Sequence, residues 1–202
     1  MLFLHHRMNS IFEYISLNWV EITGSVLSII YLYLSVKQKA GLWIFGFLCS
    51  ALYTVVFFES KFYADMTLQV YYMGVSIFGW ISWRAGKIQP EKELPVKRTT
   101  FKSALIISVI ALALFFIYRF VLLNYTDSPL PNADSLTTAL SIVATWMLAR
   151  KMIEHWLLWI FIDALSAGLY FYKALYPTAV LFVIYTVMAV IGYYQWKKDL
   201  QK

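Results

Sequence analysis

The sequence predicts an all-α integral membrane protein with seven transmembrane helices. Of its 202 residues, 61% are hydrophobic and only 14% are charged, whereas soluble domains carry about 25% charged residues. The apolar residues form long continuous runs, unlike the alternating segments of about 10 residues in a membrane β-barrel. This composition argues against a soluble enzyme. A single cysteine excludes an intrachain disulfide and a cysteine metal cluster.

Seven apolar runs follow one another along the chain, and charged or polar residues interrupt them. The first three runs are separated by Lys37–Lys39 and by the stretch around Lys61. A polar segment with two prolines, 84–102, precedes the fourth run, and Arg150 and Lys151 end the fifth. The expected spans are 19–36, 42–58, 64–83, 103–123, 134–149, 155–172 and 176–196.

The basic residues predict the orientation in the membrane. Thirteen of the 17 Lys and Arg fall in the loops on one side and in the C-terminal tail, against three on the other side. Cytoplasmic loops are enriched in Lys and Arg. We therefore expect the N-terminus outside and the C-terminus in the cytoplasm. The net charge of +6 then reflects cytoplasmic loops rather than a nucleic-acid partner.

The two halves of the chain match without a gap at an offset of 113 residues. Trp43 meets Trp156, and Gly79-x-x-x-Trp83 meets Gly192-x-x-x-Trp196. We expect a three-helix repeat at 19–83, a basic linker and connecting helix at 84–133, a second repeat at 134–196 and a basic tail at 197–202. The extra helix makes the two repeats parallel, as in carriers whose site lies at the repeat interface.

One face of the sixth span combines aromatic rings with a carboxyl group. Asp163 lies mid-span, where ionisable groups are costly and most often functional. Helical spacing places it on a stripe that would suit a flat cationic aromatic ligand, because rings attract positive charge. Alternatively, the indoles belong to an interfacial belt and Asp163 pairs with another helix. The stripe comprises Trp156, Trp159, Asp163, Ser166 and Tyr170.

Further polar residues lie within other spans. Gln69 in the third span could bind a ligand amide or join two helices. Tyr72, about one turn further on, and Tyr53 in the second span are candidates for binding or for packing. Trp80, Trp83 and Trp196 end their spans and are expected to form an aromatic belt. No metal-ligand, phosphate-loop or nucleophile motif is found, so we expect no cofactor, no metal and no enzyme.

Two motifs resemble the PnuC family of bacterial vitamin transporters. They are FYADMTLQVYY at 62–72, followed by Gly79, Trp80 and Trp83, and HWLLWI at 155–160, followed by Asp163, Ser166, Tyr176 and the closing Gly192-x-x-x-Trp196. The resemblance implies a SWEET-like 3+1+3 arrangement in the bacterial inner membrane. It also implies facilitated uptake of a vitamin precursor, trapping by a cytoplasmic kinase, and a homo-oligomer, with a trimer as the expected form.

The resemblance also assigns site residues. Gln69, Trp156 and Trp159 match family positions that line the substrate site. Asp163 stands where the nicotinamide riboside pattern has Asn, and an ionised Asp only accepts hydrogen bonds. Nicotinamide riboside is the expected substrate and thiamine the alternative, since both are cations.

The expected mechanism is alternating access around a site between the second, third, sixth and seventh spans. The rival of another class is a membrane-bound sensor or binding protein without transport. Coupling to protons through Asp163 stays open.

Overall fold

The computed structural model describes residues 19–59, 63–88, 94–172 and 174–200. These ranges form seven α-helices at the seven positions that the apolar runs predict, and the third extends five residues beyond its expected end. The helices are α2 (Trp19–Val36), α3 (Leu42–Glu59), α4 (Tyr63–Ile88), α5 (Phe101–Tyr125), α6 (Pro131–Ala149), α7 (His155–Tyr172) and α8 (Tyr176–Asp199).

The helices expose apolar side chains that a water-soluble protein would bury. Helix α5 has a mean hydropathy of 2.6 over its span and buries none of its residues. Phe101, Val109 and Phe120 on this helix are all more than half exposed. Contiguous apolar surface of this extent requires an apolar surrounding. The exposed faces are therefore the lipid-facing surface of a membrane protein.

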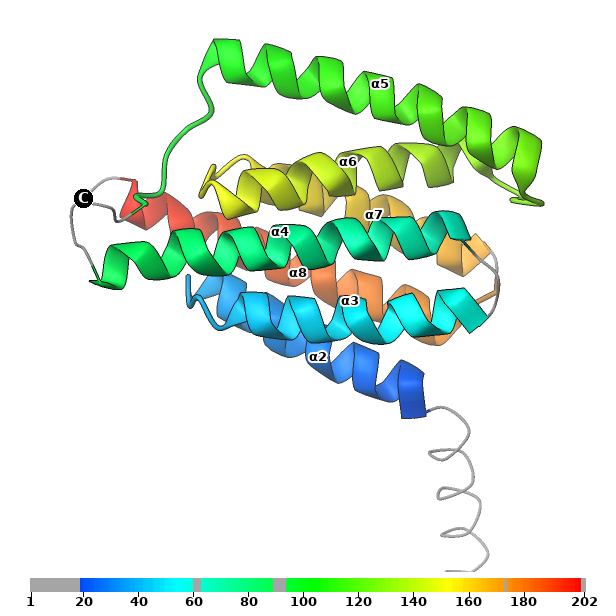
Figure 1. Cartoon of the computed structure of the whole chain (residues 1–202), viewed down its shortest axis with the longest axis horizontal. Coiled ribbons are helices and arrows are strands. Elements are labelled where there is room, and N and C mark those ends of the chain that lie inside the picture. Colours follow the sequence, from blue (N-terminus) through cyan, green and yellow to red (C-terminus); the bar gives the residue numbers. More distant parts are fainter. Residues whose placement is uncertain (1–18, 60–62, 89–93, 173, 201–202) are drawn as a thin grey trace, which may run out of the picture.

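Six of the helices form a closed ring, and α5 lies outside it (Figure 1). The ring has two halves, the first made of α2, α3 and α4 and the second of α6, α7 and α8. In each half the middle helix, α3 or α7, contacts both of its neighbours. The halves meet where α2 packs on α8 and where α4 packs on α6. Among the helices described, α5 contacts α6 alone.

The basic connections gather at one end of the bundle, the left end in Figure 1. The α2–α3 connection with Lys37 and Lys39 lies there, and so do the α6–α7 connection and the end of α8 with Lys197 and Lys198. Gln38 Nε2 donates a 2.7 Å hydrogen bond to Asp199 Oδ2, which ties the α2–α3 connection to the end of α8.

The α2–α3 and α6–α7 connections follow the same backbone path. Gln38 and Lys151, which are 113 residues apart, both have a φ of 51°, in the left-handed region. The amide of Gln38 donates to Ser35 O at 3.0 Å, and that of Lys151 donates to Leu148 O at 2.9 Å. The residues that follow repeat this correspondence, because the bonds Lys39–Leu34 and Met152–Met147 are both 2.9 Å.

Paired tryptophans pack each half in the same way. The Trp43 ring of α3 lies against Gly79 of α4, and a Cβ at Gly79 would overlap it. The Trp156 ring of α7 lies against Gly192 of α8, where a Cβ would be 2.6 Å from Trp156 Cη2. Both indole rings are about 99% buried. Glycine is needed at both positions because the ring occupies the space of a side chain.

The tryptophans that end α4 and α8 cross between the halves. Trp83 Nε1 donates to Ala149 O and Trp196 Nε1 donates to Ser35 O, both at 3.1 Å. Trp83 is 6% exposed and Trp196 is fully buried. The expectation of an aromatic belt is therefore wrong for these two residues. They stabilise the interface between the halves, because each satisfies a carbonyl at the end of a helix in the other half.

The linker is bound to the second half. Lys97 N donates to Lys151 O and Ile153 N donates to Lys97 O, both at 3.0 Å, in a parallel bridge. Thr99 donates twice to one carboxylate oxygen of Glu154, at 2.9 Å from its amide and 2.7 Å from its hydroxyl. Residues 97–99 thus pair with the α6–α7 connection just before the chain enters α5.

Candidate functional site

A cavity of about 190 Å³ lies inside the ring, between α2 of the first half and three helices of the second half. Its wall combines aromatic rings, serine hydroxyls and one carboxyl group. It is lined by Ser28, Tyr31, Leu32 and Ser35 from α2, Leu148 from α6, Trp156, Trp159 and Asp163 from α7, and Tyr185 from α8.

Part of the predicted α7 stripe lines this cavity. Trp156, Trp159 and Asp163 line it together, because the i, i+3, i+7 spacing turns all three toward the interior of the ring. Ser166 is buried on the same face but does not line the cavity. Tyr170 packs against Phe182 of α8, with ring centroids 5.0 Å apart. The stripe therefore contributes its first three members to the wall.

Among the described residues that line the cavity, Asp163 alone is charged, and it is 5% exposed. No hydrogen bond or salt bridge joins its carboxyl group to the part of the chain that the structure describes. The alternative expectation, in which Asp163 pairs with another helix, therefore finds no partner in the described ranges. A buried carboxylate is costly unless a cation or donor satisfies it. This group can therefore serve as the counter-ion of a cationic ligand.

Three other candidate binding residues do not line the cavity. Gln69 is half-buried on α4, and neither Gln69 nor Tyr72 lines the cavity. Tyr53 packs beside Phe57 with ring centroids 6.0 Å apart, and its ring lies close to Gly24 of α2. The second and third spans, α3 and α4, contribute no residue to this wall. The first and fifth spans, α2 and α6, stand in their place.

Wall residues that were not predicted from the sequence include Tyr185, Tyr31, Ser28 and Ser35. A signal for Tyr185 was present, because it is the counterpart of Tyr72 at the offset of 113 residues. Ser28 likewise matches Ser141 in the second half. Tyr31 and Ser35 carry no such signal, because their counterparts are Ala144 and Leu148. Only the packing of α2 against the second half places these two residues on the wall.

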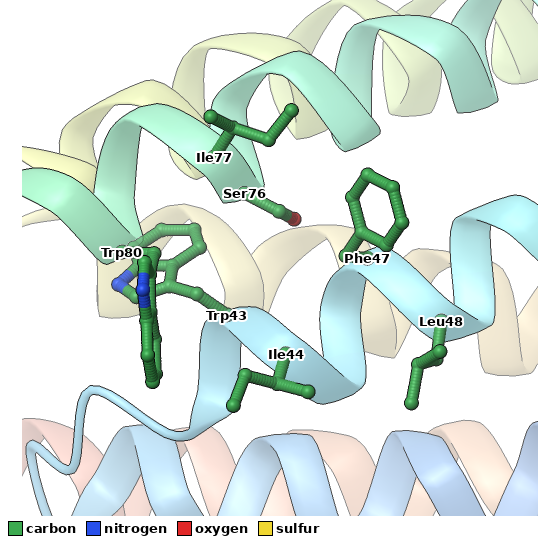
Figure 2. A pocket seen from close by; sticks show the side chains of 7 residues that line it. All are labelled: Trp43, Ile44, Phe47, Leu48, Ser76, Ile77 and Trp80. Atoms are coloured by element: carbon green, nitrogen blue, oxygen red, sulfur yellow. The ribbon is translucent and has the colours of Figure 1, made fainter.

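A second hollow, of about 320 Å³, lies between α3 and α4 (Figure 2). Ile44, Leu48 and Ile77 on its rim are 45–52% exposed, so it opens toward the lipid. Its polar atoms are the Ser76 hydroxyl and the indole nitrogens of Trp43 and Trp80. The described residues that line this groove include no charged group that could balance the charge of a cationic ligand.

The described ranges hold no group of three or more His, Cys, Asp or Glu side chains placed to bind a metal ion. The chemistry that the central cavity offers is recognition, by aromatic stacking, hydroxyl hydrogen bonds and one carboxyl group. It offers no nucleophile beside a base.

Comparison with known proteins identifies the family. The model of a family described as nicotinamide mononucleotide transporter matches residues 18–198, nearly the whole chain. The chain belongs to this family. The resemblance to bacterial vitamin carriers of the PnuC type is thereby confirmed. As a member, the chain is a multi-pass protein of the inner membrane in a family of transporters rather than enzymes.

Relatives of this chain are named for different vitamins or vitamin precursors. The nicotinamide riboside transporter PnuC of Escherichia coli is 26% identical over 89% of this chain and 85% of its own length. PnuC of Neisseria mucosa is 26% identical over 92% of this chain and 74% of its own length. The riboflavin/roseoflavin transporter RibM of Streptomyces davaonensis is 25% identical over 88% of this chain and 84% of its own length.

A solved structure shares the fold. The crystal structure of the vitamin B3 transporter PnuC superposes with a TM-score of 0.74 at 24% identity. The match covers 99% of this chain and 89% of that one. The arrangement of the seven helices is thus the arrangement of a known vitamin transporter.

Proposed function

We propose that this protein carries nicotinamide riboside across the bacterial inner membrane by facilitated diffusion. The observation that carries the proposal is the central cavity, where Trp156, Trp159 and Asp163 meet. The nicotinamide ring of this substrate is flat and positively charged. Indole faces attract a cationic ring, and a carboxylate neutralises its charge in an apolar surrounding.

The proposed mechanism is alternating access. The two repeats, 19–83 and 134–196, rock about the cavity in a 3+1+3, SWEET-like arrangement, with α5 as the connecting helix. The matching connections at Gln38 and Lys151 and the matching Trp–Gly pairs support this division. The contacts of Trp83 and Trp196 across the interface are then the ones that must rearrange, because they tie the end of each repeat to the other.

The surroundings of the carrier follow from the same proposal. The basic end of the bundle faces the cytoplasm, with the N-terminus outside and the C-terminus inside. A cytoplasmic kinase phosphorylates the substrate and keeps its free internal concentration low, so net flux runs inward. The carrier is a homo-oligomer, with a trimer as the expected form. Support for the orientation comes from the clustering of basic connections at one end.

Thiamine is the alternative substrate. Asp163 favours either cation over the uncharged riboflavin, because an unpaired buried carboxylate gains most from a positive ligand. A related expectation concerns phosphorylated forms. The described lining residues include one carboxyl group and no basic side chain, so a mononucleotide should be excluded by its phosphate charge.

Binding to the purified protein tests the substrate. Tryptophan fluorescence is recorded during titration with nicotinamide riboside, thiamine or nicotinamide mononucleotide. Binding of riboflavin, which is coloured, is measured by calorimetry. We expect quenching by nicotinamide riboside. Asp163→Asn should weaken binding of the cation, whereas Asp127→Asn, on an exposed residue after α5, should not. If thiamine alone binds, thiamine is the substrate in place of nicotinamide riboside. If none of the four compounds binds, the assignment of the cavity as a vitamin site is overturned.

Flux separates a carrier from a sensor. Proteoliposomes without ATP or an ion gradient should equilibrate labelled nicotinamide riboside, and an imposed pH difference should leave the initial rate unchanged. Binding without flux would favour the sensor. Acceleration by external acid would instead indicate proton coupling through Asp163.

A further inference from the structure

Tyr31 of α2 fills one side of the central cavity. Its ring lines the cavity and also packs into the hydrophobic core of the bundle. No hydrogen bond joins its hydroxyl to any residue in the described ranges, so its position is set by packing. One packing partner is α3, whose residues do not line the cavity.

Gly46 of α3 makes room for this ring. A Cβ at Gly46 would lie 3.0 Å from Tyr31 Cε2, 3.3 Å from Tyr31 Cδ2 and 3.2 Å from the Ser76 hydroxyl. Carbon atoms in contact prefer about 3.5–4.0 Å. A side chain at position 46 therefore requires the Tyr31 ring to shift by a few tenths of an ångström. Since Tyr31 lines the cavity and Gly46 does not, we expect the ring to shift toward the ligand space.

The second half places its bulk the other way. The counterpart of Tyr31 is Ala144, which is fully buried, and the counterpart of Gly46 is Trp159, which lines the cavity. The first half thus has an aromatic ring on its first helix and glycine on its second. The second half has alanine on its first helix and an aromatic ring on its second. Tyr31 and Trp159 thus bound the same cavity from different halves.

The space that remains between the walls is small. A volume of about 190 Å³ is below the ~300–1,000 Å³ of pockets for drug-sized ligands. A cavity of this size favours the smaller candidate ligands, such as nicotinamide riboside, over a fused-ring ligand. The fused three-ring system of riboflavin needs a wall residue to move or to be smaller.

We propose that Tyr31, held by Gly46, sets the upper size limit of the ligand and excludes fused-ring vitamins such as riboflavin. This inference rests on the proposed function of the cavity as the substrate site. It assigns discrimination by size to α2, separately from recognition of charge by Asp163 on α7. The transporter RibM, 25% identical to this chain and named for riboflavin, shows that the family includes carriers named for the larger ring system.

Two substitutions test this size limit in opposite directions. Tyr31→Ala enlarges the cavity and should raise the affinity for riboflavin at least about tenfold, which corresponds to ~1.4 kcal/mol. Gly46→Ala pushes the ring inward and should weaken nicotinamide riboside binding about threefold or more, by ~0.7 kcal/mol. Tyr33→Ala, which removes a ring that is 53% exposed on the same helix, is the matched control and should behave as the unmodified protein.

The measurement is equilibrium binding of labelled nicotinamide riboside, thiamine and riboflavin to the detergent-solubilised protein, with thermal unfolding as a check on folding. The size limit is overturned if Tyr31→Ala gains no riboflavin affinity, if Gly46→Ala leaves nicotinamide riboside binding unchanged, or if the unmodified protein already binds riboflavin as tightly as nicotinamide riboside. Should Tyr31→Ala unfold, Gly46→Ala and Gly46→Ser decide the question.

Failure of the proposed function has a different signature. The unmodified protein would then bind neither nicotinamide riboside nor thiamine, and that result overturns both proposals. Binding of either cation, with no change in Tyr31→Ala or Gly46→Ala, overturns the size limit alone.

Discussion

The two halves of the ring agree where they hold the fold together and differ where they face the cavity. The Trp–Gly pairs Trp43–Gly79 and Trp156–Gly192 pack alike, and Gln38 and Lys151 share a left-handed conformation. Trp159 and Asp163 of the second half line the cavity, whereas their counterparts Gly46 and Ser50 in the first half do not. The comparison therefore separates tryptophans that support the fold from those free to contact a ligand.

Trp156 and Trp159 differ by this criterion. Trp156 repeats the packing of Trp43 and is 99% buried against α8, so it lines the cavity chiefly as part of the scaffold. Trp159 has no aromatic counterpart in the first half and is only partly buried. We expect ligand stacking to depend more on Trp159 than on Trp156, and structural stability to depend more on Trp156.

The largest expected effect comes from filling the glycine positions under the paired tryptophans. Gly79→Ala and Gly192→Ala should each destabilise the protein by about 1–3 kcal/mol through overpacking. Thermal unfolding in detergent should show a loss of several degrees in Tm for both.

Gly74→Ala and Gly168→Ala are the matched controls, because nothing lies within 4 Å of a Cβ at either position. They should leave Tm unchanged or raise it slightly, since alanine favours a helix. A large loss in only one of Gly79→Ala and Gly192→Ala would break the equivalence of the two halves.

The next effect concerns the carboxyl group that only the second half carries. Asp163→Ala should lower uptake of nicotinamide riboside at least about tenfold, because a contact between charged partners contributes roughly 1.5–3 kcal/mol. Ser50→Ala, at the corresponding position of the first half, should change uptake less than twofold by the same scale. Wild-type uptake by Asp163→Ala would remove this residue from the site.

The indole hydrogen bonds across the interface should have a smaller and symmetric effect. Trp83→Phe and Trp196→Phe keep an aromatic ring but remove the indole donors from the carbonyls of Ala149 and Ser35, the second of which still accepts from Gln38 N at 3.0 Å. Each should destabilise the protein by about 1–2 kcal/mol. Unequal Tm losses would show that the two halves depend differently on their interface.

The smallest effect is expected at the two left-handed residues. Gln38→Val and Lys151→Val should be less stable than Gln38→Gly and Lys151→Gly by about 1 kcal/mol, because a β-branched residue is strained at a φ of 51°. The valine and glycine variants lose the same side-chain contacts, so their difference in Tm isolates the backbone. Equal stabilities would indicate that the connection relaxes.

The sequence was sufficient to predict the seven helices, because charged or polar residues interrupt the apolar runs close to the places where the helices end. It also predicted that Trp156, Trp159 and Asp163 share a face, since they belong to one helix and helical spacing is local. Family membership was predictable for the same reason, from short motifs within single helices.

The remaining wall could not be predicted because it depends on how other helices are rotated. Tyr31 and Tyr185 lie among apolar residues and other aromatic rings of α2 and α8, so the sequence does not indicate which of these rings points inward. Gln69 and Tyr53 were predicted because each is polar and lies within a span. Neither lines this wall, so a role for them in binding stays a prediction.

The five-residue connection between α6 and α7 has a consequence for how the chain enters the bilayer. Helix α7 carries eight Leu, Ile and Phe residues, each worth about −0.3 to −0.6 kcal/mol during insertion, against about +2.5 to +3.5 for an aspartate at the helix centre. Alone, α7 would partition almost evenly between membrane and water. With so short a connection, α6 and α7 can leave the insertion machinery as a hairpin, and the apolar surface of α6 then commits Asp163 to the membrane.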